Sequence, residues 1–312
     1  MNKLWMSATL SMVLGATTLA GCKQDEADVA AIRAALPQAD AVSVKVPGSS
    51  NKAEVRTLGE LAKFYQITRA TSVDLNRSAA AVLALVHAIV EYPVTSVEGD
   101  TYIWGPWTEA LNPSEYRLTV VESSPGEYTW SLEGRKKADG AAAAYRAVVS
   151  GVAIPDQPLH GKGDFMMDFD VAEELDPAGN DGQGRIAIDY DLSTTPRSVV
   201  MDYERQETPP GGVAADVTFH YEYREQADGA GDFVYTVHGD LDDNGSAWET
   251  LDIRSRWLAS GAGRSDVNIS GGDLHDAVLD GTECWDTSFG RVYWTDSLGW
   301  EATEGSVDSC AL

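Results

Sequence analysis

Apolar and polar residues alternate with a period of two through most of the chain from Tyr116 onward. Successive residues of a strand point to opposite sides of a sheet, so this alternation predicts strands with one buried and one solvated face. The alternating stretches begin at Tyr116, Glu127, Ala144, Asp164, Arg185, Ser198, Asp216, Asp232, Trp248, Ser265 and Gly290. Most connections between them are short and rich in turn residues, which predicts an antiparallel meander of roughly ten or eleven strands.

The two faces of these strands differ in chemistry. One face carries aromatic and aliphatic residues: Phe165, Met167, Phe169, Val171, Ile186, Ile188, Tyr190, Leu192, Val199, Met201, Tyr203, Val217, Phe219, Tyr221 and Tyr223. The other face carries mostly carboxylates: Asp168, Asp170, Asp189, Asp191, Asp202, Glu204 and Glu222, with His220 and Arg224. The expected fold class is α+β and mainly β, a large curved antiparallel sheet or open barrel packed on N-terminal helices.

Two segments before the strands show helical spacing. Apolar residues recur at this spacing from Glu54 to Tyr65, and a second helix is expected over 75–90, with Asp74 as its N-cap and Pro93 beyond its end. The second segment has no charged residue from 78 to 90, but 13 residues are too few to span a bilayer. We therefore expect it to cover the apolar face of the sheet, with His87 as a packed residue whose ring nitrogen is satisfied.

The domain organisation follows from these patterns. Residues 1–21 are expected to form a signal peptide, 22–53 a flexible tether, and 54–312 a single globular domain. Within that domain we expect helices over 54–92, the antiparallel sheet over about 101–300 and a C-terminal tail closed by a disulfide.

The N-terminus carries the most specific motif. Lys3 precedes an apolar stretch from Leu4 to Leu19, and small residues follow it, as in a signal peptide. The run Leu19-Ala20-Gly21-Cys22 resembles the lipobox of bacterial lipoproteins. The resemblance implies that Cys22 is acylated and anchors the protein in the cell envelope. Lys23 and Gln24 follow, whereas the inner-membrane retention signal of that class has Asp first, so the outer membrane is favoured. An ordinary secretory peptide with an incidental cysteine is the alternative.

Two further cysteines remain in a compartment that is expected to be oxidising. We predict that Cys284 and Cys310 form a disulfide that closes a loop over much of the C-terminal tail. Two free buried thiols, or two ligands of a metal whose other ligands are not evident, are the alternatives.

The formal charge of −26 is unevenly distributed and becomes −27 when Lys3 leaves with the signal peptide. Residues 22–77 hold 8 basic and 7 acidic side chains, whereas 78–312 hold 14 basic and 42 acidic ones. Such a surface repels nucleic acid and attracts cations or basic partners. Solubility alone is a competing explanation for the charge.

An acidic turn is the candidate metal site. Asp240, Asp242 and Asn244 match the first ligand positions of a calcium loop, and Gly245 falls at its sharp turn. The twelfth position is Leu251, where a calcium loop has glutamate, so a weak calcium site is the most that the pattern predicts. A plain hairpin turn at Asn244-Gly245 is the competing interpretation.

Trp104 and Trp107 flank Gly105-Pro106 between the predicted helices and the sheet. Exposed, they would form a platform for a lipid or a sugar ring; buried, they would fill a wide core. The sequence leaves both alternatives open.

Common catalytic motifs are absent from the sequence: it holds no Gly-x-Ser-x-Gly, no His-Glu-x-x-His and no phosphate-binding glycine loop. The expected architecture is similar to the half-barrel lipid-carrier domains of Gram-negative lipoprotein trafficking, a likeness that implies a hydrophobic cavity. The leading hypothesis is a non-enzymatic, lipid-anchored envelope protein, either structural or binding an apolar ligand or partner in its β-domain. The alternative is an envelope carbohydrate hydrolase that uses a pair of acidic residues.

Overall fold

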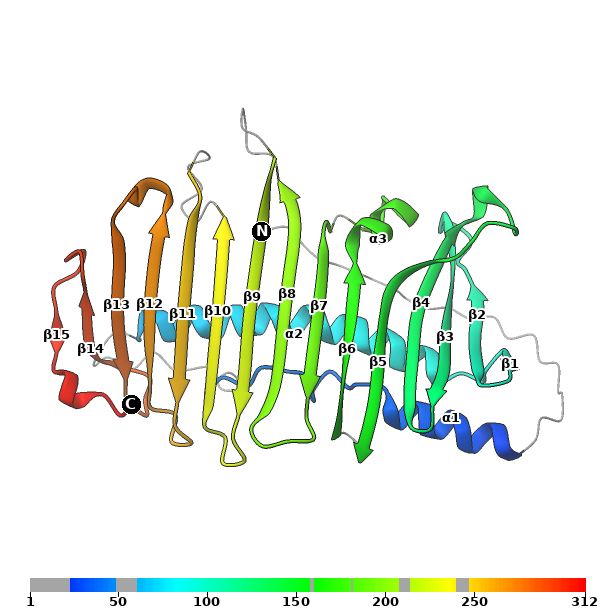
Figure 1. Ribbon diagram of the computed structural model, residues 1–312, viewed down its shortest axis with the longest axis horizontal. Helices are drawn as coiled ribbons and strands as arrows, with labels where there is room; N and C mark the ends of the chain where they lie inside the picture. Colours follow the sequence, from blue (N-terminus) through cyan, green and yellow to red (C-terminus); the bar gives the residue numbers. More distant parts are fainter. Residues whose placement is uncertain (1–22, 49–60, 158–159, 181, 208–213, 240–246) are drawn as a thin grey trace. The chain divides into compact units, whose positions relative to one another are not determined.

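The computed structural model describes residues 23–48, 61–157, 160–180, 182–207, 214–239 and 247–312. Fifteen antiparallel strands follow one another in the sheet in the order in which they occur in the chain, and the sheet is open (Figure 1). This confirms the predicted mainly β class and the meander. The chain divides into two compact units, which we describe in turn.

Unit 1 comprises residues up to 38 together with 83–185. Its strands are β1 (Ser96–Glu98), β2 (Thr101–Trp107), β3 (Ser114–Ser124), β4 (Glu127–Lys136), β5 (Arg146–Gln157) and β6 (His160–Asp168). Its helices are α1 (Lys23–Ala35), the last turns of α2 (Lys63–Val90), the short α3 (Phe169–Leu175) and the 3₁₀ turn η1 (Lys137–Asp139). Leu118, Val120 and Trp130 are completely buried in its core, where the Trp130 ring meets that of Phe165 at 6.1 Å.

Part of the segment predicted to be a flexible tether, Lys23–Ala35, forms the helix α1. Val29, Ile32 and Leu36 of the α1 region are buried, and α1 packs on β5. The prolines and polar residues of the segment suggested a linker, but its apolar residues at helical spacing bury a continuous stripe.

α3 replaces the end of a predicted strand. The alternation over 164–175 suggested continued extension, whereas the chain turns into a helix at Asp168. The Asp168 carboxylate accepts a hydrogen bond from the Val171 N–H at 3.0 Å and forms an ion pair with Arg185 at 2.9 Å. Asp168 is therefore the N-cap of a helix that buries Ala172 and Leu175, not a member of a solvated face.

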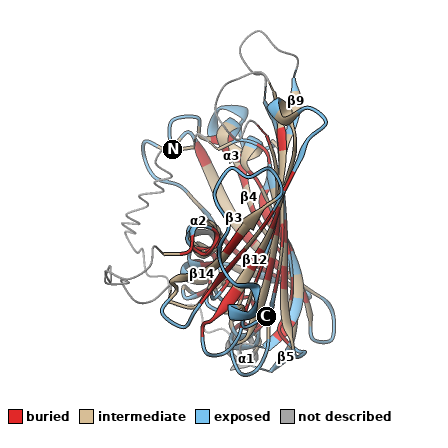
Figure 2. Cartoon of the chain, turned by 90° about the vertical axis from the view of Figure 1, so that its left-hand side faces the viewer, coloured by how far each residue is buried: buried red, intermediate tan, exposed pale blue. Residues whose placement is uncertain are grey.

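Unit 2 comprises residues 39–82 and 186–312. It contains the first part of α2 and the strands from β7 (Arg185–Asp191) onward: β8 (Arg197–Glu207), β9 (Ala215–Glu225), β10 (Gly231–Gly239), β11 (Glu249–Trp257), β12 (Gly263–Gly271), β13 (Val278–Trp285), β14 (Arg291–Asp296) and β15 (Glu304–Gly305). Two 3₁₀ turns, η2 (Gly272–Leu274) and η3 (Val307–Ser309), complete it. Within this unit, α2 lies on one side of β12 and β14 (Figure 2). The single domain over 54–312 stays a prediction.

α2 is one helix of 28 residues rather than the two shorter helices expected. Asp74 lies inside it and is not an N-cap; of the predicted helix over 54–65, residues up to 60 fall outside the described chain. Tertiary contacts explain the continuity through this polar stretch. The Asn76 side chain donates to the Val44 carbonyl and accepts from the Val44 N–H, both at 2.8 Å, and so pairs with the buried extended segment that holds Val42, Val44 and Val46.

Candidate functional site

The face of unit 2 that α2 covers is organised in rows, because the strands pair in register and facing residues lie on the same side. We name three rows, each by one member. The Glu283 row holds Val199, Tyr223, Phe233, Ser255, Ser265 and Glu283; the Met201 row holds Met201, Tyr221, Tyr235, Ile253, Val267 and Gly281; and the Tyr203 row holds Tyr203, Phe219, Val237, Leu251, Ile269 and Leu279. The three rows include residues of the apolar face that the alternation predicted: Val199, Met201, Tyr203, Phe219, Tyr221 and Tyr223.

Burial changes abruptly from one row to the next. Every member of the Glu283 row and of the Met201 row is buried. In the Tyr203 row only Leu279 is buried, and the other five side chains are partly exposed. The Phe219 ring stacks on Tyr235 of the neighbouring row, with centroids 6.2 Å apart, and meets Tyr221 edge-on, yet the residue stays partly exposed. The result is a partly exposed apolar strip across five strands.

Glu283 holds the beginning of α2 on this face. Its carboxylate is completely buried and accepts hydrogen bonds from the backbone N–H groups of Lys63 and Phe64, at 2.7 and 2.5 Å. Negative charge at a helix N-terminus satisfies otherwise unpaired N–H groups and interacts favourably with the helix dipole. Glu283 therefore serves as a cap supplied by a strand 220 residues away in sequence.

Arg291 completes this contact. Its guanidinium lies 2.8 Å from Glu283 and 3.0 Å from Glu301, and its side chain is only 10 % exposed. Burial opposes the charge on Arg291, but the two carboxylates outweigh burial and raise its pKa. A buried carboxylate is stable only when it is paired and hydrogen-bonded, and Glu283 meets both conditions.

A second polar contact lies deeper under α2. The Thr68 hydroxyl is 2.6 Å from the Ser255 hydroxyl, which is 2.6 Å from that of Ser265. All three side chains are buried, and each hydroxyl has a partner. This chain fixes the position of α2 across β11 and β12, because moving the helix would leave buried hydroxyls unpaired.

Burial also perturbs the tyrosines of this face. It raises the pKa values of Tyr221, Tyr223 and Tyr235, because the phenolate is poorly solvated among aromatic rings. These phenols therefore remain neutral at physiological pH, and the face carries no tyrosinate charge.

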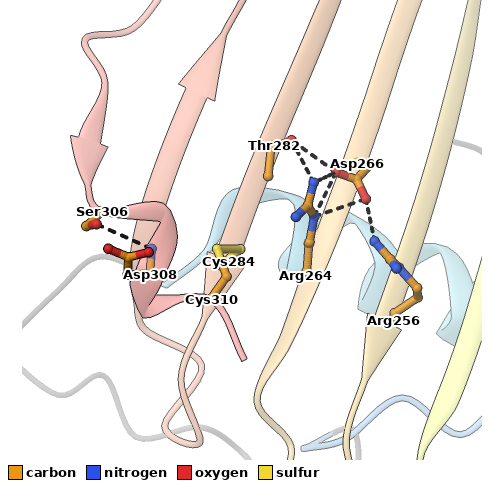
Figure 3. Close-up of a disulfide and its surroundings, with 8 residues drawn as sticks. All are labelled: Arg256, Arg264, Asp266, Thr282, Cys284, Ser306, Asp308 and Cys310. Atoms are coloured by element: carbon orange, nitrogen blue, oxygen red, sulfur yellow. Dashed lines mark hydrogen bonds and ion pairs between the residues drawn. A yellow bond between two sulfur atoms is a disulfide. The ribbon is translucent and has the colours of Figure 1, made fainter. Parts of the chain in front are cut away.

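The disulfide lies next to Glu283 but on the opposite side of β13. The structure confirms the predicted bond between Cys284 and Cys310, with a Cα–Cα distance of 5.4 Å (Figure 3). The bond fastens the C-terminal segment to β13, and Cys284 is completely buried. The same segment supplies Glu301, so the disulfide closes a loop that includes a partner of Arg291.

The solvated face of unit 2 has a different character. Its carboxylates form ion pairs with arginines on the same or neighbouring strands, such as Asp232 with Arg254 at 2.6 Å. Asp266 lies between Arg256 and Arg264, each 2.6 to 2.7 Å away, and accepts a hydrogen bond from Thr282 (Figure 3). Burial opposes the charge on Asp266, but Arg264 and Thr282 outweigh it and lower its pKa.

Apart from three histidines, the basic residues on the C-terminal side of Lys162 are all arginines. Residues 163–312 contain eight arginines, no lysine and 32 acidic residues. Each of the eight arginines makes an ion pair. The excess of carboxylates gives this half of the chain an anionic field that disfavours anionic ligands.

The tryptophans singled out in the sequence lie in unit 1. Trp104 is 2 % exposed, and its indole N–H donates to the Tyr92 carbonyl at 3.0 Å, as expected of the packing alternative. Trp107 is half-buried, and its ring lies over Gly105, where a Cβ would approach to 2.5 Å. In the same unit, His87 is a packed residue as predicted, with its Nε2 atom 3.0 Å from the Pro37 carbonyl.

The predicted lipidation and calcium residues lie outside the described chain: Cys22, and Asp240, Asp242 and Asn244. Among the residues that the structure does describe, no group of three or more potential ligand side chains is placed to hold a metal ion. None of the helices in the described ranges combines the length and the apolar character needed to cross a bilayer.

Buried carboxylates in the described chain have structural contacts. Asp168 caps α3, Glu283 caps α2, and Glu249 accepts a hydrogen bond from the Asp273 N–H at 3.3 Å. The role of Glu283 was not predicted from the sequence, although its position in the period-two alternation places it on the apolar face. Glu283 shares a face with Leu279 and Trp285, so it is a charged residue on an apolar face.

The sequence matches no protein-family model, and searches of curated proteins and of solved structures found no match either. The physical chemistry of the inner face of unit 2, the side covered by α2, is therefore the basis of the functional proposal.

Proposed function

We propose that the chain is a lipid-anchored protein of the bacterial cell envelope that binds an uncharged apolar ligand, such as an acyl chain, along the Tyr203 row. Acylation at Cys22 would supply the anchor, and the outer membrane is the favoured location. The anchor is proposed from the lipobox-like run before Cys22, and the binding site from the inner face of unit 2.

The binding proposal rests on the difference in burial between the Tyr203 row and the two rows beside it. Two complete rows are buried under α2, and the next row keeps aromatic and aliphatic side chains partly exposed across five strands. A contiguous apolar strip of this kind is typical of a surface that binds an apolar partner. Five strands at about 4.8 Å spacing give the strip a length of roughly 19 to 24 Å, which suits an extended chain better than a compact solute.

The charge distribution defines the class of ligand further. All eight arginines of the C-terminal half are ion-paired, and acidic residues outnumber them by 32 to 8. An anionic headgroup would therefore meet repulsion without a free partner among these arginines. An uncharged chain would gain about 25 cal/mol for each Å² of apolar surface removed from water.

Two experiments test the two parts of this proposal. Protein purified from membranes should release a stoichiometric apolar compound on organic extraction, detectable by mass spectrometry. Cys22→Ala should move the protein from the membrane pellet to the soluble envelope fraction, because the acyl chains provide the membrane affinity. A Cys22→Ala protein that stays with the membranes would contradict the anchor, and an empty extract would contradict the ligand.

A further inference from the structure

The start of α1 bears directly on how the proposed anchor would hold the protein. α1 begins at Lys23, the residue that follows Cys22. Val29 is its first described buried residue, followed by Ile32 and Ala35 on the same side of the helix. A helix rises 1.5 Å per residue, so the helix from Lys23 to Val29, the first residue described as buried, spans about 10 Å.

α1 is fixed to unit 1 by polar contacts as well as by its apolar stripe. The Tyr102 hydroxyl donates to the Asp28 carboxylate at 3.1 Å, near the middle of the helix. The Arg33 guanidinium donates to the Val90 carbonyl at 2.6 Å, where α2 ends and its last carbonyls lack helical partners. These contacts hold the middle and the last turn of α1 and oppose its detachment.

The exposed residues of α1 from Ala30 to its end are uncharged. Ala30, Ala31 and Ala34 are exposed, and none can repel an anionic headgroup. Carboxylates dominate elsewhere in this acidic chain, whereas residues 22–77 are nearly neutral, with 8 basic and 7 acidic side chains. Approach of α1 to a bilayer therefore meets little electrostatic opposition.

We infer that α1 is a short rigid leash that holds unit 1 against the bilayer, with the α1 end of the unit facing the lipid headgroups. The inference rests on the proposed acylation of Cys22. A flexible tether over 22–53 would have an end-to-end distance of about 30 Å, since a flexible chain spans roughly 5 to 6 Å times the square root of its number of residues. The folded part could then lie anywhere within that distance of the anchor. A docked helix reduces this freedom to about 10 Å and gives unit 1 a defined membrane-facing side.

The test compares two labels at opposite ends of unit 1. Ala31 is exposed on α1, and Leu111 is 99 % exposed in the turn between β2 and β3, at the far end of the strands from α1 (Figure 1). Ala31→Cys and Leu111→Cys are made in the full acylated chain and labelled with the same fluorophore. The proteins are reconstituted into vesicles of phosphatidylethanolamine and phosphatidylglycerol that contain a lipid with a nitroxide on its headgroup.

The nitroxide should quench most of the fluorescence at position 31 and severalfold less at position 111. Insertion of ten glycine and serine residues between Gln24 and Asp25 should reduce the difference, because the insert adds about 17 Å of flexible reach. If mass spectrometry shows the acyl chains and the two positions are quenched equally, the inferred orientation of unit 1 is wrong, whereas the proposed anchor stands. A mass without acyl chains would overturn both.

Discussion

The two faces of the unit 2 sheet use the same side-chain chemistry in opposite ways. On the solvated face, Asp232 and Arg254 form an ion pair in which the arginine side chain is 53 % exposed. On the inner face, Glu283 and Arg291 form a pair whose side chains are 0 % and 10 % exposed, and the carboxylate also binds two backbone N–H groups of α2. Water can replace either partner on the solvated face but not on the inner face. The polar residues of the inner face therefore fix the covering helix, whereas those of the solvated face mainly set the charge.

The largest expected effect is alkaline unfolding, caused by the inner-face tyrosines. Their folded-state pKa values lie above the unfolded value near 10, so their contribution to stability is complete below pH 10 and is lost as the pH rises beyond it. Circular dichroism and phenolate absorbance followed together should show a cooperative transition in which these tyrosines ionise as the fold is lost. Ionisation of every tyrosine near pH 10 with the fold intact would contradict this account.

Glu283→Ala should produce the next largest effect, a loss of about 3 to 5 kcal/mol in the free energy of unfolding. The substitution leaves the Lys63 and Phe64 N–H groups without their acceptor and removes the nearest partner of Arg291. Urea denaturation measures the change. Glu283→Gln, which keeps an acceptor oxygen, should lose less; an equal loss in both variants would show that the hydrogen bonds to α2 are not the cause.

Removing the disulfide should cost slightly less. Cys284 and Cys310 are 26 residues apart, and the entropy of closing such a loop corresponds to about 3 to 4 kcal/mol. The double variant Cys284→Ser, Cys310→Ser should unfold at a correspondingly lower urea concentration than the oxidised wild type. Because the loop contains Glu301, the loss should be smaller in a Glu301→Gln background, where one partner of Arg291 is already gone.

The smallest effect belongs to the solvated face. Asp232→Asn should change the free energy of unfolding by less than about 1 kcal/mol, because an exposed ion pair is weak and screened by salt. Denaturation at low and at high ionic strength should give a difference that shrinks with salt. A loss as large as that of Glu283→Ala would remove the contrast between the two faces.

The sequence predicted the strands of unit 2 well because each residue faces one side or the other. Ile188, Tyr190, Met201 and Tyr221 are buried, and Asp189 and Asp202 are exposed, as the period-two alternation required. The disulfide was also predictable, because the chain has three cysteines and Cys22 was assigned to the lipobox, which left one pair.

Features that depend on long-range contacts were not predictable. The continuity of α2 depends on Asn76 pairing with Val44 and on Thr68 meeting Ser255, which no local pattern indicates. The predicted tether failed for a related reason, because the stripe of α1 is short and is stabilised by packing rather than by helix propensity. Tyr203 and Phe219 were predicted to lie on the apolar face, but only the tertiary structure shows that their row is less buried than its neighbours.

Binding at the inner face is tested most directly by adding the same charge on either side of one strand. Phe219 belongs to the Tyr203 row, whereas Thr218, the preceding residue of β9, is exposed on the solvated face. N-phenyl-1-naphthylamine, an uncharged fluorescent probe, is titrated into wild type, Phe219→Asp and Thr218→Asp after circular dichroism has shown each to be folded. We predict that Thr218→Asp binds like wild type and that Phe219→Asp binds about ten- to hundredfold more weakly, the equivalent of the roughly 1.5 to 3 kcal/mol that burial of a phenylalanine provides. Equal binding by all three proteins, or an equal loss in both variants, would contradict a ligand site on the Tyr203 row.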